Sequence, residues 1–270
     1  MTADWHFRLA SVVFGIAVAG ELACQAARGA AGAGAWGWLV LLGAGSWVVG
    51  LVWRERVGVG RAWSCAVWVV GVSLVAARLA RREGAGFGRI EFPGGQPLFV
   101  AGVPLSAPLL GWVVVGGAFL VVEGLWGEWR AGVSTLTALV GAQMGLMILP
   151  VIGGVRGCWR WEGSRCPQQV DGGFSCLPWT ALGACFLLGL MLALGLVIMG
   201  DNWSSAEART RRQAWAPAAV LLGLSFVCFG ANVSGGLWFA AAFSAANAMF
   251  FGAVVTWYLR GGGRGRNVVS

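Results

Sequence analysis

Apolar stretches of about twenty residues recur along this chain, and short clusters of charged residues separate them. About 20 apolar residues are what an α-helix needs to cross the hydrocarbon core of a bilayer. Backbone groups must be satisfied within each span in lipid, so several such stretches indicate a helical bundle. We predict an all-α polytopic transmembrane bundle, with one integral membrane domain over residues 1–270. Eight spans are predicted, with seven as the alternative: 9–27, 35–53, 62–77, 107–126, 131–155, 177–199, 214–232 and 236–259.

The composition supports the same class. Only 11% of the 270 residues are charged and 58% are hydrophobic, whereas soluble domains carry roughly 25% charged residues. This excludes a soluble enzyme and a nucleic-acid-binding module. The net charge of +8 is therefore attributed to basic loops that face anionic lipid head groups, and no nucleic-acid partner is expected.

The distribution of arginine gives a weak prediction of orientation. With both termini on one side, 11 of the 19 basic residues fall on that side. The excess favours cytoplasmic termini in a bacterial cytoplasmic membrane. We also expect two long loops, over about 81–106 and 156–177, and a flexible tail rich in arginine and glycine over 260–270.

Two carboxyl groups fall inside predicted spans, Glu21 in the first and Glu123 in the fourth. Ionisable groups inside a membrane are costly and often functional. A carboxyl group buried among apolar side chains can stay protonated and act as a general acid. The alternative for Glu21 is a structural hydrogen bond to a neighbouring helix. The alternative for Glu123 is an interfacial carboxylate that reaches water.

Metal and cofactor signatures are absent from the sequence. The only histidine is His6, and the seven cysteines form no C-x-x-C pair, so no zinc or haem site is predicted. No phosphate-binding loop follows a predicted strand. We therefore expect neither metal nor cofactor. A disulfide within one loop is the alternative to isolated thiols for Cys158, Cys166 and Cys176.

Two loop regions carry a family resemblance. The first contains GAGFGRIEF over 84–92 and AGVPL over 101–105, followed by Trp112. The second contains GCWRWEG over 157–163 and leads to Pro178. In order and spacing they resemble the membrane-bound carotenoid biosynthesis proteins, over about residues 60–200. That family includes carotenoid 1,2-hydratases and hydratases that act on bisanhydrobacterioruberin, and this chain resembles a diverged member.

The resemblance implies a reaction. It is the addition of water to a terminal carbon–carbon double bond of an acyclic carotenoid end group, without a cofactor. A buried acid would protonate the double bond, and aromatic faces would stabilise the cation. The candidate acids are Glu21, Glu123 and Glu91. The candidate substrate-binding residues are Phe87, Arg89, Trp112, Trp159 and Trp161, and the structural motif residues are Gly84, Gly88, Pro104 and Pro178.

The departures from the family pattern keep other functions open. Acidic residues that the family carries are replaced here by Ala77 and Leu149, and the two motif tyrosines by Ile90 and Phe92. The first alternative is a non-catalytic carotenoid-binding or accessory membrane subunit. The second is a small-solute transporter. The expected partners are a lipid-soluble polyene and membrane lipid. For tryptophans at span ends, an interfacial belt is the alternative to a role in binding.

Overall fold

The computed structural model describes residues 2–29, 34–83, 89–92, 97–126, 160–161, 179–200, 212–234, 236 and 238–260. Nearly all of these residues are helical. The helices are α1 (Thr2–Arg28), α2 (Gly34–Val57), α3 (Val59–Glu83), α4 (Ser106–Gly111), η2 (Trp112–Gly116, a π-helical turn), α5 (Gly117–Trp126), α8 (Trp179–Gly200), α9 (Arg212–Ser234) and α10 (Trp238–Leu259).

Two short antiparallel ladders accompany the helices at the loops. In one, β1 (Ile90–Glu91) pairs with β4 (Arg160–Trp161). In the other, β2 (Phe99–Val100) pairs with β3 (Val103–Pro104). Between β2 and β3, Ala101 and Gly102 both have positive φ angles, 52° and 80°. This backbone twist suits a two-residue hairpin turn.

Four helices contain a segment long and apolar enough to cross a membrane: Trp5–Arg28, Gly34–Val57, Val59–Glu83 and Trp215–Ser234. Shorter apolar segments are Ser106–Val122, Leu187–Met199 and Ser244–Leu259. The predicted helical membrane class is confirmed at this level. The predicted span 131–155 lies outside the described residues, and the count of eight spans stays a prediction.

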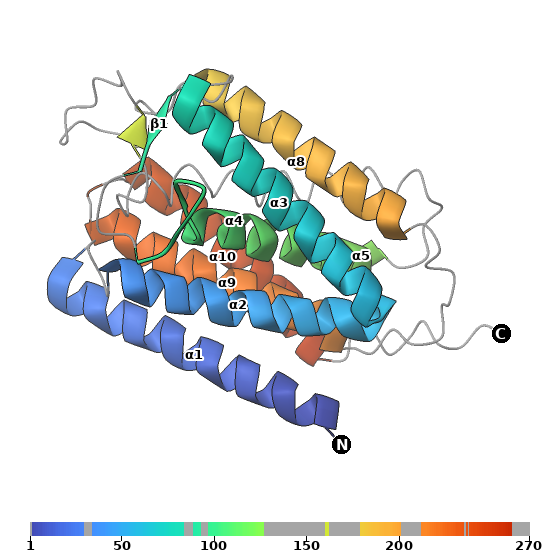
Figure 1. Ribbon diagram of the computed structural model, residues 1–270. Helices are drawn as coiled ribbons and strands as arrows, with labels where there is room; N and C mark the ends of the chain where they lie inside the picture. The colour runs from blue at the N-terminus through green and yellow to red at the C-terminus, as the bar shows by residue number, and fades with distance from the viewer. Residues whose placement is uncertain are drawn as a thin grey trace.

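The helices lie in a bundle whose middle is formed by α2, α9 and the α4–α5 segment (Figure 1). Helix α1 packs against α2 and α9 along one edge, while α3 and α8 lie along the other edge. Helices α9 and α10 form a closely packed hairpin. Helices α3 and α8 lie side by side with opposite chain directions (Figure 1).

Aromatic packing fills the centre of this bundle. Trp53 is fully buried, and its ring centroid lies 6.0 Å from that of Trp112 and 5.6 Å from that of Phe119. The Trp53 indole donates a hydrogen bond to the carbonyl oxygen of Gly116, 3.2 Å away. Trp112 donates to the carbonyl oxygen of Ser46 at 3.3 Å. π-Helical turns are frequent at functional sites, but this one presents a carbonyl oxygen to the core.

Helix α1 meets α9 through two glycines spaced seven residues apart. A Cβ atom at Gly223 would lie 3.0 Å from the Phe14 ring, and one at Gly230 would overlap the Gln25 side-chain oxygen. Small residues let helices in a membrane approach closely. The buried side chains of α1, namely Phe7, Ala10, Phe14, Glu21 and Gln25, form one helical face.

Candidate functional site

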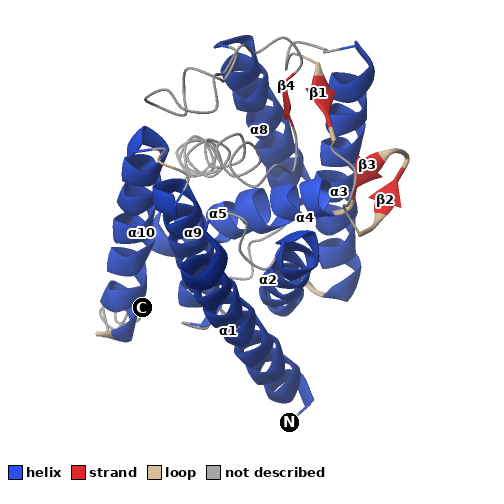
Figure 2. Ribbon diagram, turned by 90° about the vertical axis from the view of Figure 1, so that its left-hand side faces the viewer, coloured by secondary structure: helices blue, strands red, loops and turns tan. Residues whose placement is uncertain are grey.

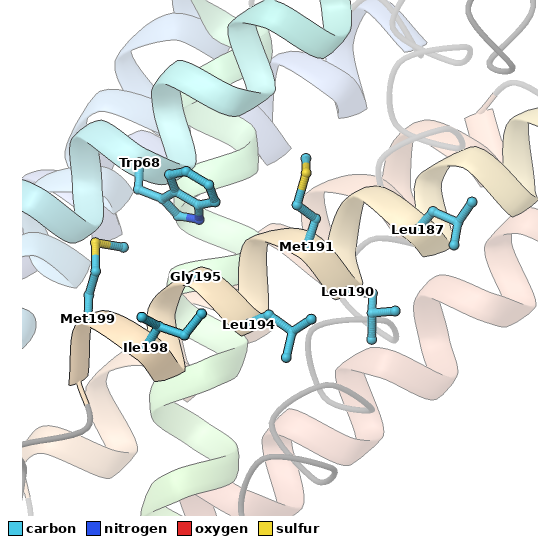
Figure 3. A pocket seen from close by; sticks show the side chains of 8 residues that line it. All are labelled: Trp68, Leu187, Leu190, Met191, Leu194, Gly195, Ile198 and Met199. Carbon is cyan, nitrogen blue, oxygen red and sulfur yellow. The ribbon is translucent and has the colours of Figure 1, made fainter.

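An apolar groove lies between α3 and α8 (Figure 3). Its volume is about 450 Å³, within the range of 300–1,000 Å³ that is usual for small-molecule sites. Helix α8 supplies most of the lining, and α3 supplies one tryptophan. The lining residues are Trp68, Leu187, Leu190, Met191, Leu194, Gly195, Ile198 and Met199.

Trp68 closes the groove against Gly195. A Cβ atom at position 195 would overlap the Trp68 indole ring, so only glycine admits this ring position. The indole Nε1 is buried, and no hydrogen-bond acceptor for it lies within the part of the chain that the structure describes. The groove therefore presents an aromatic ring and flexible methionine and leucine side chains, all suited to contact with hydrocarbon.

No lining residue of the groove carries a titratable group. The walls can hold an apolar chain by dispersion and shape, but they supply neither an acid nor a base. The lining of the groove is thus apolar throughout.

The predicted acid Glu21 lies elsewhere, on the face of α1 that packs against α9. It is 2% exposed and so lies inside the bundle, while its role as an acid stays a prediction. The Gln25 amide lies 3.4 Å from a Glu21 carboxylate oxygen and also donates to the Val227 carbonyl oxygen at 3.0 Å. The Glu21–Gln25 pair therefore joins α1 to α9.

Glu21 and the groove are on different edges of the bundle. Helix α1 lies along one edge, whereas the groove lies between α3 and α8 along the other, with α2, α9 and α4 between them (Figure 1). Figure 2, turned by 90°, shows the same separation of α1 from α8. The structure thus does not bring the predicted acid to the groove.

The two motif loops do meet. The β1–β4 ladder places Ile90 opposite Trp161 and Glu91 opposite Arg160. The first loop is also joined to α3, because Arg81 donates a hydrogen bond to the carbonyl oxygen of Gly102. The resemblance drew on both loops, and their pairing supports treating them as one surface.

The predicted substrate-binding and motif residues are dispersed. Arg89 is exposed just before β1, and Pro104 is buried in β3. Trp112 is 3% exposed and packs in the aromatic core, away from the groove lining. The structure gives only the backbone positions of Glu91 in β1, Glu123 in α5 and Trp161 in β4. Outside the described residues lie Gly84, Phe87, Gly88, Trp159 and Pro178.

Several buried polar residues were not singled out in the sequence. Asn232 on α9 is 1% exposed, and its amide nitrogen lies 3.0 Å from the Ser244 hydroxyl on α10. Asn247 is also buried. A polar residue inside an apolar span is the signal that would have found them, as it found Glu21. Among the described residues, no group of three or more potential metal ligands occurs.

Comparison of the chain with protein-family models, with curated proteins and with solved structures found no match. The resemblance to the carotenoid biosynthesis proteins therefore stays a prediction, carried by the motif residues alone.

Proposed function

We propose that this chain is a polyene-binding membrane protein of carotenoid metabolism that holds its ligand in the α3–α8 groove. The proposal includes eight spans in a bacterial cytoplasmic membrane, with both termini in the cytoplasm. The observation that carries it is the groove itself, because its eight lining residues are apolar and offer no catalytic group. A non-catalytic or accessory role fits these walls better than hydration does.

The length of the groove supports a chain-like ligand. Its α8 lining extends from Leu187 to Met199, a rise of about 18 Å along a helix. The same segment leaves Leu187 and Ile198 strongly exposed, so the groove opens along the side of the bundle. A lipid-soluble chain enters such a site laterally from the bilayer.

Co-purification from a bacterial host that makes lycopene tests this proposal. After membrane insertion is verified and the protein is purified in mild detergent, we expect a bound pigment seen by its absorption spectrum. Met191→Trp would fill the groove and should lower the pigment-to-protein ratio severalfold. Met249→Trp is the matched control, because Met249 is an exposed residue of α10 outside the groove lining. Equal pigment-to-protein ratios in the two variants, or no bound pigment in the parent protein, would contradict the proposal.

Hydration of a terminal double bond is the second candidate function. It is favoured by the burial of Glu21 beside Gln25 within an apolar helix contact. Chromatography of the pigments made by the same host tests it. A hydroxylated product that disappears with Glu21→Gln would support hydration, whereas unchanged pigment in a strain with verified insertion would count against it.

A further inference from the structure

The groove has a charged residue at one end. Arg61 precedes Trp68 on α3 by seven residues. The two side chains therefore leave the helix in directions about 20° apart. Seven residues rise about 10 Å, and α8 runs in the opposite direction with Gly195 against Trp68. Arg61 therefore lies beyond the Met199 end of the groove, where it is exposed.

One face of α3 carries Trp68 and Val75 between two arginines, and Arg78 lies to one side of it, about 80° round the helix from Trp68. Arg61, Trp68, Val75 and Arg82 follow one another at intervals of seven residues. The distance from Arg61 to Arg82 along the helix is about 31 Å, close to the roughly 30 Å of a bilayer core. The spacing of Arg61 and Arg82 therefore suits opposite surfaces of a bilayer, with Trp68 and Val75 between them.

Of Arg61 and Arg82, Arg61 lies nearer to an end of the groove, and unlike Arg78 it leaves α3 within about 20° of the direction of Trp68. The α8 lining reaches Met199, next to the last residue of the helix, but begins only at Leu187, well after α8 starts at Trp179. Trp68 contacts Gly195, so the level of Arg82 lies near the start of α8. The groove consequently stops short of Arg82 and reaches toward Arg61.

We infer that the groove ligand is a polyene that ends in a carboxylate, with the carboxylate at Arg61 and the conjugated chain running past Trp68 toward Leu187. This rests on the proposed function and adds the polar end of the ligand. Arginine forms paired hydrogen bonds with a carboxylate and keeps its charge at the membrane surface while its stem contacts apolar groups. A pure hydrocarbon would fill the groove but make no contact with this guanidinium group.

Binding of a conjugated tetraene fatty acid and of its methyl ester tests the inference. The full chain is placed in discs of zwitterionic phosphatidylcholine, and polyene fluorescence excited through tryptophan is titrated. The acid should bind more tightly than the ester. Arg61→Gln should weaken acid binding about tenfold and leave ester binding unchanged, since a hydrogen bond to a charged group is lost. Arg61→Lys should recover part of the loss.

Arg82→Gln is the matched control and should bind both probes like the parent protein. Equal affinity for acid and ester in the parent, or no effect of Arg61→Gln, would overturn the inference while leaving groove binding intact. Weaker binding of the acid by Arg82→Gln, with unchanged binding by Arg61→Gln, would also overturn the inference. If neither probe binds and Met191→Trp leaves the pigment-to-protein ratio unchanged, the proposed function itself is contradicted.

Discussion

Trp53 and Trp68 lie on neighbouring helices and have opposite surroundings. Trp53 is fully buried, contacts two aromatic rings and donates its indole proton to Gly116. Trp68 is half-buried, lies over Gly195 and has no acceptor for its indole proton among the described residues. The first ring completes a packed core, while the second closes an open groove.

The two tryptophans represent two kinds of helix contact in one bundle. Around Trp53, aromatic side chains interdigitate and the indoles of Trp53 and Trp112 find hydrogen-bond acceptors, as in a close-packed protein interior. On the α3–α8 side, Trp68 lies over Gly195 and the helices leave an apolar groove of about 450 Å³. Close packing is thus concentrated on one side, and open apolar space on the other.

Truncation of each tryptophan should reveal the largest difference between the two regions. Trp53→Ala should lower the free energy of unfolding by about 3–5 kcal/mol, because it leaves a closed cavity and an unused carbonyl oxygen. Trp68→Ala should cost only about 1 kcal/mol, since lipid can refill an open groove. Reversible unfolding in mixed detergent micelles measures both. Equal losses would contradict the division into core and groove.

A glycine substitution at the α1–α9 contact should have the next largest effect. Gly230→Ala places a methyl group on the Gln25 amide oxygen and should destabilise the protein by about 1–3 kcal/mol through overpacking. Gly252→Ala on α10 is the control, because its nearest neighbour would lie at an ordinary 3.7 Å. The same unfolding assay compares the two. A loss at Gly252 as large as that at Gly230 would show that α1 is not held by close packing there.

Much of the helical framework was predictable, because the length of an apolar stretch alone indicates a span. The predicted spans 9–27 and 35–53 fall within α1 and α2, which extend further into charged residues at their ends. The same pattern placed Glu21 inside a predicted span. Gln25, four residues later on the same helix face, could have been recognised as its neighbour.

The groove was not predictable, since the sequence does not specify which face of α3 meets α8. Seventeen tryptophans look alike in the sequence, and their roles depend on the partners that tertiary packing supplies. Trp112, predicted to contact substrate, instead donates a hydrogen bond to Ser46 in the core. The π-helical turn at Trp112–Gly116 is likewise set by packing and follows from no local signal.

The polar contact between α9 and α10 should give the smallest effect and sharpen the description of the core. Asn232→Ala removes the hydrogen bond to Ser244, but it also removes a buried amide oxygen that has no partner among the described residues. These changes oppose each other, so we expect a net loss of only about 0.6 kcal/mol. A double-mutant cycle with Ser244→Ala isolates the pairwise contribution. A coupling energy near zero would mean that apolar packing alone holds this hairpin, in contrast to the hydrogen-bonded indole of Trp53.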